Sequence, residues 1–288
     1  MATVYLNGAY LPSEQAFVSV LDRGFLLGDG VYEVIPAYHG HLFRFEEHMR
    51  RLQCSLDAIR LANPLTITQW QTLLSQLLIE NGGGNQSVYL QVTRGAAPQR
   101  DHAFPNVVKH TIFAMTSPIT PVPFEVAERG VAAITVDDVR WKLCNIKAIT
   151  LLANVLARQE AVDHGCAEAI FVRDGWVTEG AAANIFIVEN NVLLTPPKGQ
   201  FLLPGITRDL VLELAQLNGI PCREENIEVP RLLQASEVWL TNSAREVIPV
   251  VRLDNTTIGN GQAGPLWRTM RQIYSDYKES LRDKESTK

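Results

Sequence analysis

Two lysines lie close together in the stretch VRWKLCNIKAITLLANV, residues 139–155, but their neighbours differ. Lys142 follows a charged and an aromatic residue and has the setting of an ordinary solvated side chain. Lys147 precedes a run of Ala, Ile and Leu residues that should be buried. Burial disfavours the charged form of an amine, so it would push Lys147 towards its neutral, nucleophilic form. The sequence therefore suggests a reactive amine at position 147, although a lysine that extends from a strand end to solvent would have similar neighbours.

A carboxylate and two features that suit an anion lie elsewhere in the chain. Glu179 ends an expected strand in VTEGAAANIF. The segment GITRD, residues 205–209, begins an expected helix, where backbone N–H groups and the Thr207 hydroxyl suit a phosphate. Arg51 could also bind a phosphate, because its planar guanidinium can donate two parallel hydrogen bonds. Each feature alone also has a structural explanation, such as a turn residue for Glu179 and a turn into a helix for GITRD.

Taken together, these residues suit pyridoxal phosphate. This cofactor needs an amine for its aldehyde, an anion site for its phosphate and a carboxylate near its pyridine nitrogen. Lys147 could supply the amine, Arg51 and the start of the GITRD helix the anion site, and Glu179 the carboxylate. We therefore expect pyridoxal 5'-phosphate as the cofactor, and we predict no metal site.

The bulk composition restricts the class of protein. The chain has 288 residues, of which 46% are hydrophobic and 20% charged, as is typical of soluble globular proteins. A net charge of -5 argues against nucleic acid or an anionic membrane as the main partner. The four cysteines form no Cys-x-x-Cys pair, which favours reduced thiols in a cytosol. Because we find neither a signal peptide nor an apolar stretch of membrane-spanning length, we expect a cytoplasmic protein.

The elements that must position these residues form two expected domains. Residues 1–117 should form a smaller α/β domain, with a hairpin that turns at Asn7-Gly8 and a helix that begins after Thr68 as its N-cap. Three prolines mark residues 118–123 as a linker. Residues 124–288 should form a larger cofactor-binding domain, with a helix over residues 149–165, a second helix capped by Thr207 and a C-terminal surface helix. This order predicts an α+β or mixed α/β fold.

Six segments occur in the order found in one known family. They are DRGFLLGDGVYEVI, EEHMRRL, VTRG with RDHAFP, VRWKLCNIKAITLLANVLARQEA, VTEGAAANIF and LLPGITRD. On these segments the chain resembles the fold-type IV pyridoxal-phosphate enzymes, and within them it is most similar to the bacterial D-amino acid aminotransferases. The resemblance covers nearly the whole chain and implies the two-domain fold of that family.

The resemblance assigns the catalytic roles residue by residue. Lys147 matches the Schiff-base lysine, which also moves the proton between Cα of the substrate and C4′ of the cofactor. Glu179 matches the carboxylate that keeps the pyridine nitrogen protonated. Tyr32 matches a tyrosine that lines the substrate side, where Arg100 and His102 are expected to hold the substrate carboxylate and so select the D-enantiomer.

The cofactor contacts follow from the same resemblance. Arg51, Thr207 and the backbone of Ile206 match the phosphate contacts, and Leu203 matches a leucine that packs against the cofactor ring. Ser243 is a further expected phosphate contact. Two segments depart from the family pattern: Ala181-Ala182-Ala183 replaces serines that often follow the TEG motif, and Asn242 and Ala244 flank Ser243.

The implied reaction converts a D-amino acid and a 2-oxo acid by a ping-pong route, with D-alanine, 2-oxoglutarate and D-glutamate as expected substrates. A homodimer is also implied, in which the loop APQRDHAFP reaches the partner's site. Three alternatives stay open. Branched-chain L-aminotransferases share the fold and the lysine but usually lack the Arg-x-His pair, aminodeoxychorismate lyases eliminate pyruvate, and a non-catalytic relative would serve as a binding module.

Overall fold

The computed structural model describes residues 2–120 and 122–285, with side chains described as far as residue 280. The chain divides into two compact units, Met1–Thr120 with Ile146–Leu151, and Pro121–Asn145 with Leu152–Lys288. The sequence placed all of residues 124–288 in the second domain. The short segment Ile146–Leu151 instead packs within the first unit and brings Lys147 with it.

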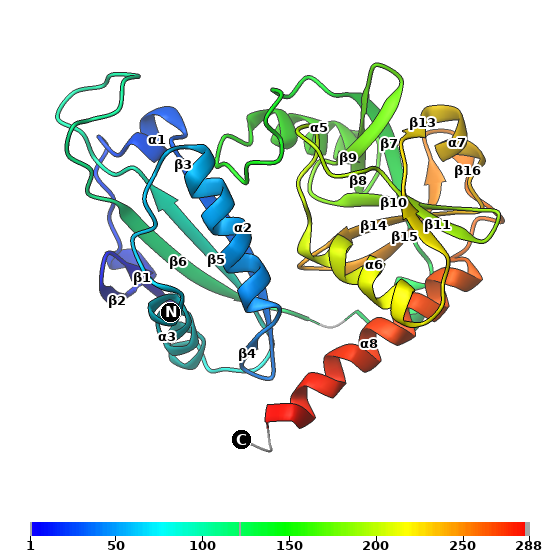
Figure 1. Cartoon of the computed structure of the whole chain (residues 1–288), viewed down its shortest axis with the longest axis horizontal. Coiled ribbons are helices and arrows are strands. Elements are labelled where there is room, and N and C mark those ends of the chain that lie inside the picture. Colours follow the sequence, from blue (N-terminus) through cyan, green and yellow to red (C-terminus); the bar gives the residue numbers. More distant parts are fainter. Residues whose placement is uncertain (1, 121, 286–288) are drawn as a thin grey trace. The chain divides into compact units, whose positions relative to one another are not determined.

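The first unit contains a six-stranded antiparallel sheet in the order β2-β1-β6-β5-β3-β4 (Figure 1). Its strands are β1 (Thr3–Leu6), β2 (Ala9–Pro12), β3 (Gly30–Tyr38), β4 (His41–Leu42), β5 (Gln86–Thr93) and β6 (Thr111–Pro118). Its helices are α1 (Arg23–Leu27), α2 (Phe45–Ala58) and α3 (Ile67–Glu80), with a short 3-10 turn at Ser13–Gln15.

Local chemistry sets the turns of this unit. Asn7 and Gly8 both have positive φ values, 50° and 103°, as an Asn-Gly hairpin turn requires. Helix α3 begins after Thr66, not after the predicted Thr68, because Thr66 forms a capping box with Gln69. The two residues exchange side-chain and backbone hydrogen bonds, an arrangement that Thr68 does not make.

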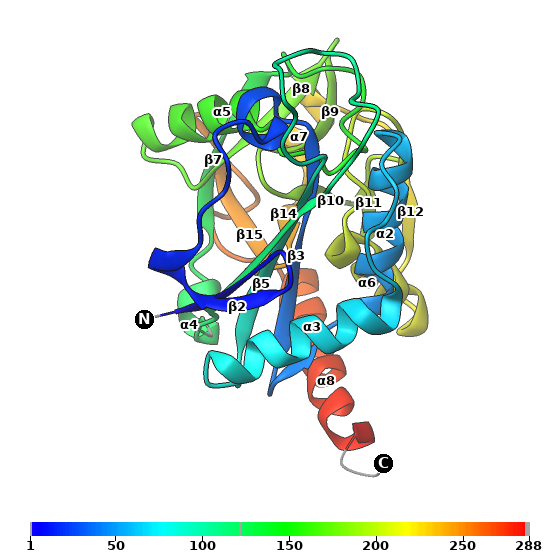
Figure 2. The ribbon, with the colours of Figure 1, turned by 90° about the vertical axis from the view of Figure 1, so that its left-hand side faces the viewer.

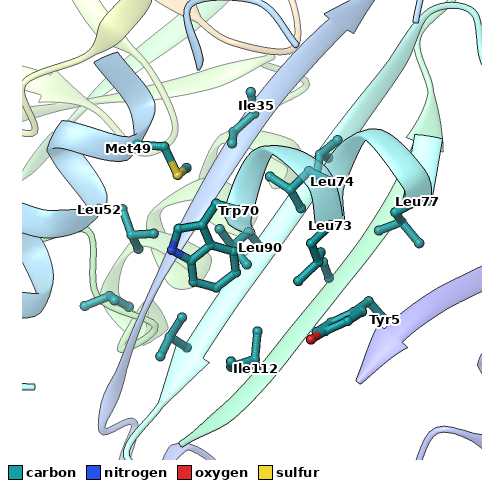
Figure 3. Packing of buried hydrophobic residues seen from close by; sticks show 14 of the residues in the cluster. Tyr5, Ile35, Met49, Leu52, Trp70, Leu73, Leu74, Leu77, Leu90 and Ile112 are labelled. Carbon is teal, nitrogen blue, oxygen red and sulfur yellow. The ribbon is translucent and has the colours of Figure 1, made fainter. Parts of the chain in front are cut away.

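Helices α2 and α3 run in different directions over the sheet (Figure 2) and bury its main core. Trp70 of α3 lies at the centre of this cluster, beside Met49, Leu52 and Leu90 (Figure 3). Ile146 and Ala148 belong to the same cluster, so the backbone on both sides of Lys147 is fixed by hydrophobic packing.

The second unit contains a ten-stranded sheet in the order β12-β11-β10-β14-β15-β7-β8-β9-β13, with β16 beside β15. Its strands are β7 (Val131–Asp137), β8 (Glu168–Arg173), β9 (Trp176–Gly180), β10 (Asn184–Glu189), β11 (Val192–Thr195), β12 (Cys222–Glu224), β13 (Ile227–Glu228), β14 (Glu237–Asn242), β15 (Glu246–Leu253) and β16 (Thr256–Thr257). Its helices are α4 (Phe124–Ala127), α5 (Leu152–Asp163), α6 (Ile206–Leu217), α7 (Val229–Gln234) and α8 (Pro265–Glu285).

Helix α5 differs from its prediction. It begins at Leu152 and not near residue 149, and the residues after Lys147 are less buried than expected. Leu152, Val155 and Leu156 are 71%, 58% and 63% exposed. Helix α8 covers the segment predicted as a surface helix and, as such helices do, buries one face, where Trp267 is 0% exposed. No described helix has both the length and the apolar composition needed to cross a membrane.

Candidate active site

Lys147 is held in the first unit through its backbone. Its N–H donates a hydrogen bond to Ser55 Oγ at 3.2 Å, and its carbonyl accepts one from the Tyr32 N–H at 3.0 Å. The side chain is half-buried, and its Nζ lies 4.2 Å from the centre of the Tyr32 ring. Lys142, in contrast, is exposed. The structure therefore places the amine of Lys147 over an aromatic ring, whose face attracts the charged form of the amine.

Tyr32 lies on β3 and is positioned by the neighbouring strand. Its ring stacks on that of Tyr89 in β5, with ring centroids 5.6 Å apart. Burial, together with the nearby Tyr32, raises the pKa of Tyr89 to about 12, so Tyr89 stays neutral at physiological pH. The stacked pair gives Tyr32, the tyrosine expected to line the substrate side, a fixed position next to Lys147.

Arg51 is part of a buried charged group that the sequence did not reveal. Its Nε and Nη2 donate to the two oxygens of Glu33 at 2.8 and 2.7 Å, and His48 Nδ1 lies 2.8 Å from Glu33 Oε2. Burial alone would raise the pKa of Glu33, but Arg51 and His48 together hold it far below its usual range. Arg51 is therefore a charged guanidinium whose direction is set by Glu33.

A sequence signal for this group existed. Val31, Glu33 and Ile35 alternate along β3 with their side chains buried, so the glutamate is in phase with core residues. A carboxylate at such a position needs a buried cationic partner. His48 and Arg51 occupy one face of α2, three residues apart, and provide it.

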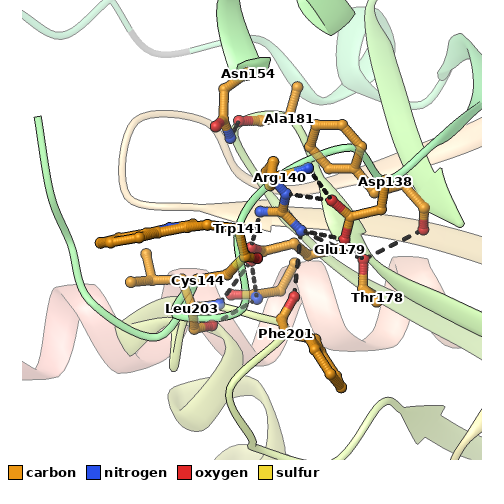
Figure 4. Close-up of polar contacts among 12 residues, drawn as sticks. Asp138, Arg140, Trp141, Cys144, Asn154, Thr178, Glu179, Ala181, Phe201 and Leu203 are labelled. Atoms are coloured by element: carbon orange, nitrogen blue, oxygen red, sulfur yellow. Dashed lines mark hydrogen bonds and ion pairs between the residues drawn. The ribbon is translucent and has the colours of Figure 1, made fainter. Parts of the chain in front are cut away.

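Glu179 is the next-to-last residue of β9 in the second unit and accepts hydrogen bonds from Arg140, Asn184 and Leu203 (Figure 4). Arg140 Nη1 donates to Oε1 at 2.5 Å. Asn184 Nδ2 and the Leu203 N–H donate to Oε2 at 3.2 and 2.9 Å. The carboxylate is only 5% exposed, and a carboxylate that accepts several hydrogen bonds has a well-defined orientation.

Arg140 is a second site residue that the sequence did not identify. Its Nε and Nη2 donate to the carboxylate of Asp138 at 2.9 and 3.0 Å, and Nη2 also reaches the Phe201 carbonyl at 3.2 Å. Its guanidinium lies 4.1 Å from the centre of the Phe171 ring. Burial alone would lower the pKa of Arg140, but Asp138 and Glu179 raise it, so the charge beside Glu179 is permanent.

The expected anion cradle lies at the start of α6. Its N-cap is Gly205 and not Thr207 as predicted, so Ile206 and Thr207 are the first two helical residues. A Cβ on residue 205 would lie 1.9 Å from Asn184 Oδ1, so only glycine leaves room for Asn184 to reach Glu179. Tyr274 of α8 is hydrogen-bonded to the Thr207 side chain, and its burial raises its pKa. The N–H groups at this helix end have no intrahelical partners and suit an anion.

Ser243 is half-buried in the turn between β14 and β15. Asn242 stabilises this turn, because its Oδ1 accepts the N–H groups of Ala244 and Arg245 at 3.1 and 2.8 Å. Leu203, the expected ring contact, is half-buried and binds Glu179 through its backbone. Arg100 and His102 lie exposed in the loop that joins β5 to β6 in the first unit.

Residues 30–253 match the family described as amino-transferase class IV. The chain belongs to this family. The predicted fold-type IV relationship and mixed helix-and-sheet fold are therefore confirmed, and the protein is an aminotransferase of a family that uses pyridoxal phosphate and acts on amino and 2-oxo acids.

Individual relatives refine this comparison. The chain is 41% identical over 281 residues to a D-alanine aminotransferase of Staphylococcus epidermidis, covering 97% of this chain and 99% of that protein. It is 40% identical over 268 residues to a D-alanine aminotransferase of Bacillus licheniformis, covering 93% and 94%. Among solved structures, a branched-chain amino acid aminotransferase of Escherichia coli is similar at a TM-score of 0.88 and 27% identity, covering 96% of this chain and 94% of that one.

Proposed function

We propose that this chain is a pyridoxal-phosphate-dependent D-amino acid aminotransferase that transfers the amino group of D-alanine to 2-oxoglutarate. The geometry of Lys147 carries the proposal, since its backbone is fixed on both sides and its amine lies over the Tyr32 ring. The choice of D-amino acids is supported by relatives of that activity at 41% and 40% identity over nearly the whole chain.

The donor set fits the cofactor. In the second unit, the N–H groups of Ile206 and Thr207 at the start of α6 and the Ser243 hydroxyl suit a phosphate. In the first unit, the Arg51 guanidinium is a group of the kind that binds phosphate. A pyridine nitrogen that carries a proton matches the acceptor oxygens of Glu179. Leu203 would pack against the ring. When bound, pyridoxal phosphate supplies an aldehyde that bonds covalently to amines and a ring that withdraws electrons from the substrate Cα.

Lys147 performs the proton transfers. Its Nζ would hold the cofactor through the aldehyde that the cofactor supplies, and, once released, would act as the base that takes the proton from the substrate Cα and returns it. The Tyr32 ring beneath Nζ limits the positions that the amine can take. Proton transfer between two carbons by one base requires such a fixed position.

Glu179 would accept a hydrogen bond from the protonated pyridine nitrogen of the cofactor and so favour that protonated form. Its orientation is set by Arg140, Asn184 and the Leu203 N–H, all of which donate to its carboxylate. Asp138 holds Arg140 in turn, so the carboxylate does not need to reorient during the reaction. The second unit thus supplies a preorganised carboxylate.

Arg100 and His102, with Tyr32, would bind the α-carboxylate of the substrate. The hydrogen that leaves the substrate Cα must face Lys147, the proposed base. Once that hydrogen and the nitrogen are fixed, only the carboxylate and the side chain can exchange places around Cα. The pocket that carries the cationic groups therefore decides which enantiomer reacts.

A branched-chain L-aminotransferase is the second candidate, because a solved structure of such an enzyme shares the fold at a TM-score of 0.88. Its lower identity of 27% and the Arg100-Asp101-His102 segment favour the D-specific enzyme. Steady-state assays of the purified holoenzyme with 2-oxoglutarate separate the two. We expect D-alanine to react and L-leucine and L-isoleucine to be poor donors, and the opposite order would favour the branched-chain enzyme.

The active form is proposed to be a homodimer in which the loop with Arg100 serves the partner's site. Helix α5 exposes four large apolar side chains, and Phe17, Val20 and Phe25 of the first unit are 82%, 70% and 74% exposed, which is unusual for a monomer. Mixing Arg100→Leu and Lys147→Ala proteins under conditions of subunit exchange should restore some activity. Full activity in a demonstrated monomer would contradict the shared site.

A further inference from the structure

One arginine binds the backbone of the loop that carries Arg100 and His102. Arg23, the first residue of α1, is buried, and its Nη1 donates to the carbonyls of Asp101 at 2.5 Å and Ala103 at 3.1 Å. Its Nη2 donates to the carbonyl of His102 at 3.3 Å. A single guanidinium thus binds three successive carbonyls of an exposed segment.

Asp29 fixes this guanidinium. Its Oδ2 accepts a hydrogen bond from Arg23 Nε at 2.7 Å and another from Arg94 Nε at 2.8 Å, and its Oδ1 accepts from Arg94 Nη2 at 3.1 Å. Burial alone would raise the pKa of Asp29, but Arg94 and Arg23 together lower it. Asp29 therefore remains an anion that holds two arginines in place.

The second of these arginines attaches the loop at another point. The Arg94 guanidinium lies 3.8 Å from the centre of the Phe104 ring, and Arg60 lies 5.2 Å from it. Arg94 also donates to the carbonyls of Ile59 and Arg60 at 2.7 and 3.2 Å, which connects it to the end of α2. The loop is therefore bound through its backbone by Arg23 and through Phe104 by Arg94.

The loop between β5 and β6 is held by more side-chain contacts than a connection between two neighbouring strands requires. Within the described chain, residues 97–110 form neither helix nor strand, so their shape does not come from a backbone ladder. Removing an arginine from water costs free energy, which its hydrogen bonds to the loop carbonyls must offset. The bonds from Arg23 fix the backbone carbonyls of Asp101 and His102. The side chains of Arg100 and His102 stay exposed.

We propose that Arg23, held by Asp29, is a positioning residue for substrate binding, because it fixes the backbone of residues 101–103 and so directs Arg100 and His102 towards the substrate carboxylate. The inference rests on the proposed function of those two residues. Bidentate binding of a carboxylate requires a well-placed guanidinium, and small displacements weaken it strongly. Arg23 would thus contribute to affinity and enantiomer selection without touching the substrate.

The test compares the Arg23→Met holoenzyme with an Arg50→Met control, since the Arg50 side chain lies 70% exposed on α2. Two quantities are measured: the rate of trypsin cleavage after Arg100, followed by mass spectrometry, and the KM and kcat for D-alanine. We expect Arg23→Met to speed the cleavage and to raise KM about tenfold, with a smaller change in kcat and an unchanged cofactor absorption band. The Arg50→Met control should match the parent in every readout.

Two further variants separate the possible failures. If Arg100→Leu raises KM but Arg23→Met changes neither cleavage nor KM, the inference is overturned and the proposed function stands. If Arg100→Leu is silent as well, the proposed carboxylate site is wrong and the inference falls with it. Should Arg23→Met fail to fold, Arg23→Lys replaces it, because one ammonium cannot span the same set of acceptors. A folded Arg23→Lys protein with parental cleavage and KM would overturn the inference.

Discussion

At the scale of single residues, the chemistry depends on where Lys147 and Glu179 are held, not on their types alone. Lys147 is fixed through its backbone and lies over Tyr32, whereas Lys142 is exposed. Glu179 is held by Arg140 and a backbone N–H. In the proposed mechanism, both groups would therefore begin the reaction in their working positions, which would reduce the reorganisation needed in the transition state.

The first prediction concerns the amine. Borohydride reduction of the holoenzyme followed by peptide mapping should place the cofactor label on Lys147, because that side chain is fixed at the proposed site. Lys142→Ala should be labelled like the parent, and Lys147→Ala should not be labelled. A label on Lys142 in the parent would refute the assignment.

The second prediction concerns Glu179. Glu179→Gln should still bind the cofactor but slow the proton-transfer step on the order of 100-fold or more, because a neutral ring nitrogen makes the ring a poorer electron sink. Rapid-mixing absorption measures the step, and the ¹⁵N shift of a labelled pyridine nitrogen reports its proton. Glu189→Gln, which removes a charge paired with Arg231, is the control. An unchanged rate and ¹⁵N shift would mean that Glu179 only packs.

At the scale of elements, the start of α6 connects the phosphate cradle to Glu179. Gly205 caps the helix, and its lack of a side chain leaves room for Asn184, which donates to both Glu179 and the Leu203 carbonyl. The start of α6 and the Glu179 carboxylate are thus linked, because Gly205 packs closely against the Asn184 amide that binds Glu179.

We therefore predict that Gly205→Ala weakens cofactor binding. The added methyl would displace Asn184, at a cost of about 1–3 kcal/mol in unfolding free energy. Absorption titration with the cofactor and thermal unfolding measure the two effects. Gly199→Ala is the matched control, because a Cβ there meets no atom within 4 Å. Identical behaviour of the two variants would show that Asn184 can move without consequence.

The contact between Glu33 of β3 and His48 of α2 predicts how stability depends on pH. Burial lowers the pKa of His48 below its ordinary 6.5, although Glu33 opposes this shift. The unfolded chain therefore binds more protons than the folded one as the pH falls through 6.5, and stability decreases in that window. His48→Asn, which can still donate to Glu33, should lose less of its Tm between about pH 7.5 and pH 5.5 than the parent. An equal loss in both proteins would assign the pH dependence to other groups.

The sequence predicted most elements but not the contacts that finish the site. Turn residues and hydrophobic periodicity located the first hairpin and the helices α3, α5, α6 and α8, although the starts of α3, α5 and α6 differ. The N-caps of α3 and α6 were misplaced, because a capping box at Thr66 and the close packing of Gly205 decide them. The roles of Arg140 and Glu33 were missed, since their partners Glu179 and Arg51 lie 39 and 18 residues away. Such distant pairings are set by sheet topology, which local patterns do not encode.

At the scale of the whole molecule, the chain combines two units with different tasks. The first unit carries the amine and the proposed substrate loop, and the second carries the carboxylate and the helix start for a phosphate. The family relationship predicted from the order of motifs is confirmed by the match over residues 30–253. Two D-alanine aminotransferases resemble the chain over nearly its whole length, which supports the proposed D-amino acid activity.

The most direct test of this account is a single half-reaction. The holoenzyme is mixed with D-alanine or L-alanine without any 2-oxo acid, and the pyruvate formed per subunit is counted. We expect about one pyruvate per subunit from D-alanine, because without an acceptor each site can turn over only once. We expect little pyruvate from L-alanine and none with Lys147→Ala. Preferential release of pyruvate from L-alanine, or equal release by Lys147→Ala, would contradict the account.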